Sequence, residues 1–140
     1  MEIREIDLID PPTEDNEVYW TLIGWKIGKY WVARGCWGNI GSPCRVSYDF
    51  QRVWDWNQKH LGHKIQLLGF YHTHPHMDAS PSSQDYRAMA GATVAFGRPL
   101  ACLIEGVNGL RGHWFIDDET PHMTLWAKRF GKNLFIGRLP

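Results

Sequence analysis

The feature that most constrains this chain is a pair of histidines at the end of an apolar run. Residues 67–71 read LLGFY, a short and bounded apolar run of the kind that forms a buried strand. The run leads into His72-Thr73-His74-Pro75. Because side chains at positions i and i+2 of a strand point to the same side, both imidazoles can reach one point just beyond the strand. Pro75 then ends the strand pairing.

A carboxylate is expected near the same point. After a polar loop, residues 81–85 begin a predicted helix, and Ser82 and Asp85 stand three positions apart in it. Residues three apart share a face of a helical turn. Two neutral imidazoles and one carboxylate suit a zinc ion and leave a fourth coordination position open for water. The pattern therefore predicts one catalytic zinc ion bound by His72, His74 and Asp85.

Each of these residues also has an ordinary structural interpretation. A single histidine is most often a surface or core residue, and Ser-x-x-Asp before a helix is most often a capping arrangement. The complete spacing is His-x-His, seven residues, Ser, two residues and Asp. This combination is much rarer than its parts, and it favours a functional site.

The combination resembles the signature of the JAMM (MPN+, or JAB) metalloprotease family. The match includes the proline after the second histidine and the Pro81–Ser82 pair. The family also uses a glutamate upstream, followed by a Gly-x-Leu-x-Gly-like run. Glu17 precedes a leucine and a final glycine at the matching positions, but Trp20 stands where the family usually has a small residue. A bulky residue beside the base would narrow or block the groove.

The chemistry of amide hydrolysis assigns roles to two further residues. Glu17 is the candidate base that takes a proton from water and passes it to the departing amine. Ser82 is a poor metal ligand, so we expect it to donate a hydrogen bond to the developing oxyanion. Glu105, Glu2 and Glu5 are rival bases, although none of them precedes the leucine and glycine pattern.

Other polar residues of the chain have weaker functional claims. His76 and Asp78 lie in the loop between the predicted ligands, where contact with substrate and simple exposure to solvent explain them equally well. The remaining histidines that no motif surrounds are expected to be structural or on the surface: His63, His113 and His122.

Bulk composition excludes several classes of function. The 140 residues fit one domain, residues 1–140, with a real core. Fifteen basic and fifteen acidic residues give no net charge, which argues against a nucleic-acid or membrane-surface partner. The three cysteines show no C-x-x-C pairing, so reduced thiols in a cytoplasmic protein are expected. The eight tryptophans fit either an aromatic core or a surface that grips a partner.

The pattern of residues predicts strands that alternate with two helices. A short edge strand is expected within residues 1–10, and further strands at 17–27, 30–33, 64–71, 100–104 and 112–116. Turns are expected at Gly28–Lys29 and Asn108–Gly109, and a loop at 35–43. One helix should cover residues 50–61 between an Asp49 N-cap and Gly62.

The second helix should run from residue 81 to Gly91 or Gly97. A final strand or short helix should lie in the remainder, which contains Leu125-Trp126 and Leu134-Phe135-Ile136. This order of elements indicates an α/β fold. The resemblance, which covers residues 17 to about 116, implies a deaminase-like JAB/MPN fold. Its sheet would be mixed, mostly antiparallel and flanked by helices.

The resemblance also implies a function. Similar proteins are zinc-dependent (iso)peptidases that cut the bond between the C-terminus of ubiquitin, or a ubiquitin-like protein, and an amine. A short domain such as this one resembles the prokaryotic JAB group, whose substrates include ubiquitin-like modifiers and sulfur carriers. Removal of a modifier from a target and trimming of its precursor both remain open. Some members act beside E1- and E2-like enzymes in antiphage systems, which makes such partners a hypothesis here.

Two alternative functions compete with this one. A zinc deaminase needs H-x-E followed by P-C-x-x-C. Pro43-Cys44 lacks the second cysteine and precedes the histidines, so this class is rejected. The other alternative is a catalytically silent MPN-type scaffold or partner-binding module. Silent members have usually lost ligands, whereas all three are present here.

Overall fold

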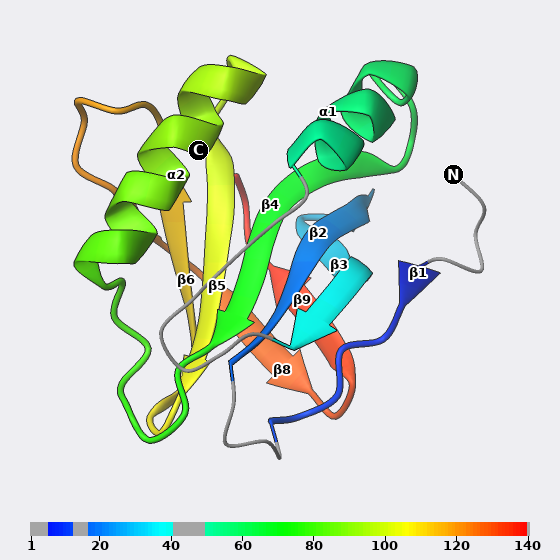
Figure 1. Cartoon of the computed structure of the whole chain (residues 1–140). Helices are drawn as coiled ribbons and strands as arrows, with labels where there is room; N and C mark the ends of the chain where they lie inside the picture. The colour runs from blue at the N-terminus through cyan, green and yellow to red at the C-terminus, as the bar shows by residue number, and fades with distance from the viewer. Residues whose placement is uncertain (1–5, 13–16, 41–49, 140) are drawn as a thin grey trace.

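The computed structural model describes residues 6–12, 17–40 and 50–139, which form one curved sheet and two helices (Figure 1). The sheet has nine strands in the order β7-β6-β5-β4-β2-β3-β9-β8, and β1 pairs with β3 outside this path. In chain order the elements are β1 (Ile6–Asp7), β2 (Val18–Ile27), β3 (Tyr30–Ile40), α1 (Phe50–Lys59), β4 (Gln66–Thr73), α2 (Ser83–Phe96), β5 (Leu100–Gly106), β6 (Gly109–Phe115), β7 (Met123–Leu125), β8 (Ala127–Phe130) and β9 (Asn133–Ile136).

Strand directions confirm the predicted mixed and mostly antiparallel sheet. The β4–β5 pair is parallel, and the other pairs among the described strands are antiparallel. A parallel pair needs a crossover connection, and α2 supplies it here. The predicted α/β class is therefore correct, and α2 brings the chain back beside the strand that carries the histidines.

The two faces of the sheet bury separate cores. Both helices cover one face, where Val53 of α1 and Met89 of α2 pack with Phe70 and Cys102 of the central strands. The other face is concave. There Leu134 of β9 joins residues of β2, β4 and β5, and the sheet curls until β8 comes close to β6.

Most of the expected elements are present with shifted ends. The strand of the histidines begins at Gln66, two residues later than predicted, and continues through Thr73. The second helix ends at Phe96 and is capped by Gly97. The φ of 63° at Gly97 lets its N–H donate to the carbonyls of Thr93 and Val94. The first helix ends at Lys59 rather than at residue 61. Its expected N-cap, Asp49, lies outside the described residues.

The loop predicted at residues 35–43 is wrong for residues 35–40, and residues 41–43 lie outside the described residues. Strand β3 continues through Gly35 to Ile40. Its glycines are needed because the Trp20 ring of β2 lies against them: a Cβ at Gly38 would come within 2.5 Å of that ring. The end of the chain also differs from expectation, since three short strands, β7, β8 and β9, form there in place of one strand or helix.

Candidate metal centre

Strand β4 presents both histidines at the end of the sheet. His72 lies inside the strand and His74 directly follows it. The main-chain N–H of His74 donates to the carbonyl of Glu105 on β5, 2.8 Å away. On the other side of β4, the Thr73 hydroxyl accepts from the Val18 N–H at 2.9 Å. The end of β4 is thus fixed by both of its neighbours, and the two imidazoles project from a rigid support.

The first turn of α2 supplies the carboxylate. Ser82 is the N-cap residue, and its Oγ accepts from the Asp85 N–H at 3.1 Å. Asp85 Oδ2 in turn accepts from the Ser82 N–H at 2.8 Å, which completes a capping box. The capping interpretation of this pair is therefore correct, and it does not exclude a site. The same box fixes the orientation in which the carboxylate faces β4.

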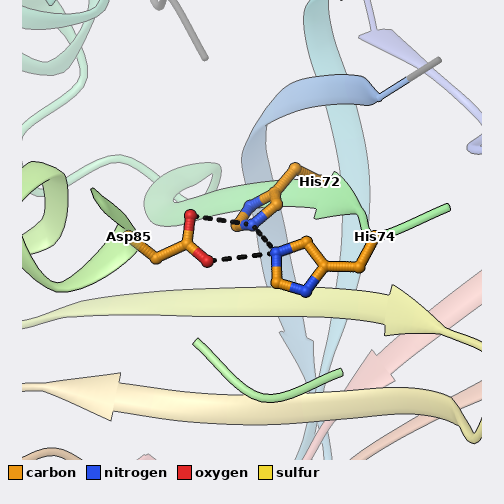
Figure 2. Close-up of side chains that lie close together, drawn as sticks. All are labelled: His72, His74 and Asp85. Carbon is orange, nitrogen blue, oxygen red and sulfur yellow. Dashed lines mark hydrogen bonds and ion pairs between the residues drawn. The ribbon is translucent and has the colours of Figure 1, made fainter. Parts of the chain in front are cut away.

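The three side chains meet as the spacing predicted (Figure 2). His72 Nε2 lies 3.1 Å from His74 Nε2 and 3.1 Å from Asp85 Oδ1, and His74 Nε2 lies 3.1 Å from Asp85 Oδ2. All three residues are buried. Ligands about 2.1 Å from a tetrahedral zinc ion stand roughly 3.4 Å from one another. The residues therefore fit a metal ion with little rearrangement.

The proton on His74 is placed by a main-chain contact. His74 Nδ1 lies 2.9 Å from the carbonyl oxygen of Asp78. A carbonyl only accepts, so Nδ1 carries a hydrogen, and in the neutral ring that metal binding requires the lone pair of Nε2 faces the cluster. Histidine ligands of metals are commonly oriented in this way. The sequence points only to the side chain of Asp78, because no residue-type signal reveals a main-chain acceptor.

The electrostatics of the cluster favour a cation. Burial alone would raise the pKa of Asp85, but hydrogen bonds from His72 and His74 outweigh burial and hold that pKa below its usual range. The hydrogen bond to Asp85 raises the pKa of His74 against the opposing effect of burial. An ionised carboxylate therefore lies against both ring nitrogens, and a bound metal ion would take the place of the protons between them.

Glu17 lies beside this cluster. It directly precedes β2, and the pairing of Tyr19 with His72 brings it to the end of β4. Burial raises the pKa of the Glu17 carboxyl, His72 and His74 oppose the shift, and Asp85 adds to it. Its Oε2 atom is buried and has no hydrogen-bond partner within the described part of the chain. The expected base and the expected ligands are therefore brought together.

Comparison with models of protein families shows to which family the chain belongs. The model for prokaryotic homologs of the JAB domain matches residues 13–126. The chain belongs to this family. The solution structure of protein DSY2949 from Desulfitobacterium hafniense is similar to this JAB domain, with a TM-score of 0.51 and 22% identity over 79% of this chain and 75% of that chain. At that identity the likeness concerns the fold alone. A search among curated proteins finds no match.

The concern about Trp20 does not hold in this JAB domain. Its ring lies over Gly35 and Gly38 and packs on the concave core. Neighbouring strand residues point to opposite faces, so this is the face opposite the histidines. A tryptophan at this position therefore leaves the space beside Glu17 unaffected.

Glu105, the main rival base, is also on the opposite face. Its carboxylate accepts a hydrogen bond from the Tyr71 hydroxyl at 2.7 Å and pairs with Arg129 of β8 at 2.7 Å. It is therefore committed to the concave core of the JAB domain and cannot reach the cluster. The other two rivals, Glu2 and Glu5, lie outside the described residues.

The remaining histidines show structural contacts. The ring N–H of His113 donates to the Ala79 carbonyl at 2.9 Å and so ties the loop before α2 to β6. The His122 ring stacks on Phe115. His63 packs edge-on against the ring of His60.

Among the described residues, no helix is both long and apolar enough to cross a membrane.

Proposed function

We propose that this JAB domain is a zinc-dependent (iso)peptidase that cleaves the C-terminal linkage of a ubiquitin-like modifier or a sulfur-carrier protein. The observation that carries the proposal is the buried triangle of His72, His74 and Asp85 with 3.1 Å sides. Beside it lies the unpartnered carboxylate oxygen of Glu17. The family to which the chain belongs includes metalloisopeptidases. The substrate class rests on that membership.

Hydrolysis of an amide at this site requires a nucleophile that is reactive near neutral pH. A zinc ion held by His72, His74 and Asp85 would make a water molecule acidic and would polarise the carbonyl of the scissile amide. Glu17 would accept the proton of that water and later give it to the leaving amine. Burial favours this role, because a raised pKa brings the carboxyl closer to the pH at which it must both take and give a proton.

Ser82 has a hydrogen available for the oxyanion. Its Oγ accepts from the Asp85 N–H, which leaves the hydroxyl hydrogen free to point elsewhere. The residue is half-buried at the N-terminus of α2, where the helix dipole favours negative charge. The same residue thus orients a ligand through its main chain and would stabilise the transition state through its side chain.

Only the family resemblance suggests which partners the JAB domain works with. E1- and E2-like enzymes, which make and transfer modifiers, are the proposed functional partners, and a cytoplasmic setting follows from them. The alternative of a silent scaffold rested on Trp20, and that residue faces away from the site.

The deciding experiment measures cleavage of ubiquitin-like and sulfur-carrier proteins fused at their C-termini to a fluorescent amine. Cleavage by the wild type should stop when a zinc chelator is added and return with zinc. The Glu17→Gln variant should bind zinc and fail to cleave, whereas Glu119→Gln, a control at an exposed glutamate, should cleave normally. A protein that binds one zinc ion and cleaves no fusion in the panel would favour the scaffold.

A further inference from the structure

The outer face of the last strands carries an exposed aromatic hollow. It has a volume of about 530 Å³ and lies where β3, β8 and β9 meet. We call it the aromatic hollow and define it by its lining residues: Tyr30, Trp126, Lys128, Phe130, Asn133 and Phe135. None of these residues belongs to the metal cluster. In the order of strands, β9 and β8 follow β3 at the end opposite β7 (Figure 1), and the hollow shares no lining residue with the candidate metal centre.

The aromatic rings of the hollow are exposed and support one another. Tyr30, Trp126 and Phe130 are 47%, 49% and 53% exposed. The Tyr30 and Trp126 rings are 5.3 Å apart, and Phe130 meets Phe135 edge to face at 5.7 Å. Rings held in this way lose little conformational entropy on binding, and aromatic anchors of this kind dominate the binding energy of protein interfaces.

The surroundings of the hollow are basic. The Lys128 amine lies 5.1 Å from the centre of the Phe130 ring. The two neighbouring hollows are lined by Lys26, Lys29 and Arg138, and no acidic side chain lines any of these three hollows among the described residues. The chain as a whole has no net charge. These basic side chains form a local positive patch, which we call the basic rim. It favours a partner with negative charge.

We propose that the aromatic hollow is a docking site for an acidic segment of a partner protein, in which Asp or Glu residues flank aromatic or aliphatic side chains. The apolar side chains would enter the hollow, and the carboxylates would meet Lys128, Lys29 and Arg138. This pairing follows the complementarity of charge that protein interfaces use to select partners. The inference does not depend on the activity proposed for the metal centre.

Two other occupants fit the observations less well. A second copy of this chain would bring one basic rim against another in a symmetric contact, which is unfavourable. Single-stranded nucleic acid binds by stacking its bases on open ring faces. Here the amine of Lys128 covers a face of Phe130, and Tyr30 and Trp126 pack on each other.

The test is a selection of random dodecapeptides displayed on phage against the immobilised full chain. The selected peptides are then synthesised, and their affinities are measured for the wild type and four variants. Trp126→Ala and Lys128→Glu change the hollow. Trp54→Ala is the matched control, because Trp54 is a similarly exposed tryptophan (42%) on α1, and Lys59→Glu is the matched control for charge.

We expect enrichment of peptides that combine acidic and apolar residues. Their affinity should fall roughly tenfold or more in each hollow variant and stay unchanged in each control. Either absence of enrichment or equal binding to wild type and hollow variants would overturn the proposal. Selective binding of oligothymidylate, or a dimer in light scattering that Trp126→Ala disrupts, would replace it with the corresponding alternative. A far-ultraviolet circular dichroism spectrum like that of the wild type verifies that each variant is folded.

Discussion

The hydroxyl of Thr73 accepts a hydrogen bond from the main-chain N–H of Val18, 2.9 Å away. This contact joins the strand that carries His72 and His74 to the start of β2, directly after Glu17. Together with the pairing of Tyr19 and His72, this side chain therefore helps to set the position of the base relative to the ligands. Thr73 is a positioning residue in the proposed reaction.

Replacing Thr73 with valine should separate catalysis from metal binding. The valine keeps the shape of the side chain but removes the acceptor, so the Val18 N–H loses its partner and Glu17 is less well placed. A small displacement of a reacting group costs on the order of 10- to 100-fold in rate. We expect kcat to fall by that amount with zinc affinity unchanged. Thr93→Val is the control, because the hydroxyl of Thr93 bonds only within α2.

Each of the three ligands should be necessary for binding of one metal ion. His72→Ala, His74→Ala and Asp85→Asn should each abolish stoichiometric zinc binding, measured by titration calorimetry and elemental analysis. Asp85→Asn keeps an acceptor for the capping box and so isolates the loss of charge. In the wild type, zinc at about 1,000 times its Kd should add roughly 4 kcal/mol to the free energy of unfolding. The control His122→Gln should bind normally.

The local parts of this site could be predicted from sequence because their geometry is periodic. The alternation of a strand places His72 and His74 together, and a helical turn places Ser82 beside Asp85. Contacts between distant or main-chain groups could not be predicted. The Thr73–Val18 bond spans 55 positions, and the Asp78 carbonyl that orients His74 carries no residue-type signal.

Strand β3 shows why element ends are hard to predict. A glycine-rich sequence from residue 35 indicates a loop when it is considered alone. In the fold, Gly35 and Gly38 are the positions over which the Trp20 ring of β2 packs, so the strand continues. The same packing determines where Trp20 points. Both the misplaced loop and the concern about a blocked groove therefore result from one tertiary contact.

Burial of Glu17 should appear in the titration of its carboxyl in the metal-free protein. Because burial raises its pKa, the carboxyl remains protonated to a higher pH than an ordinary glutamate. A zinc ion beside it would lower that pKa, because a cation favours the charged form of a carboxyl. The measurement is an NMR titration of the glutamate carboxyls in the metal-free protein, with Glu17→Gln used to assign the signal. A midpoint at the ordinary value would contradict a buried base.

The same shift predicts a cost to stability. A carboxyl whose pKa is higher in the folded state binds protons more tightly there, so the metal-free protein loses stability as the pH rises through that pKa. Removing the charge by Glu17→Gln should therefore raise the Tm of the metal-free protein at neutral pH. The difference should vanish well below the ordinary glutamate pKa. Glu119→Gln, at an exposed site, should change the Tm at neither pH.

The buried ion pair of Glu105 and Arg129 should contribute to stability only while both charges are present. Glu105 receives hydrogen bonds from Tyr71 and Arg129, and Arg129 Nη1 also donates to the carbonyl of Ile9 at 2.6 Å. Arg129→Met leaves the Glu105 charge buried without its counter-charge, which typically costs about 3–5 kcal/mol of unfolding free energy. The measurement is unfolding by denaturant.

The double variant Arg129→Met/Glu105→Met removes both charges and should recover much of that loss, because buried pairs are often replaced by apolar residues at little cost. Lys132→Met is the control, since Lys132 and Asp10 form an exposed pair worth little. A double variant as unstable as Arg129→Met would mean that the contacts of Arg129 with the segment around Ile9, rather than neutralisation of Glu105, account for its contribution.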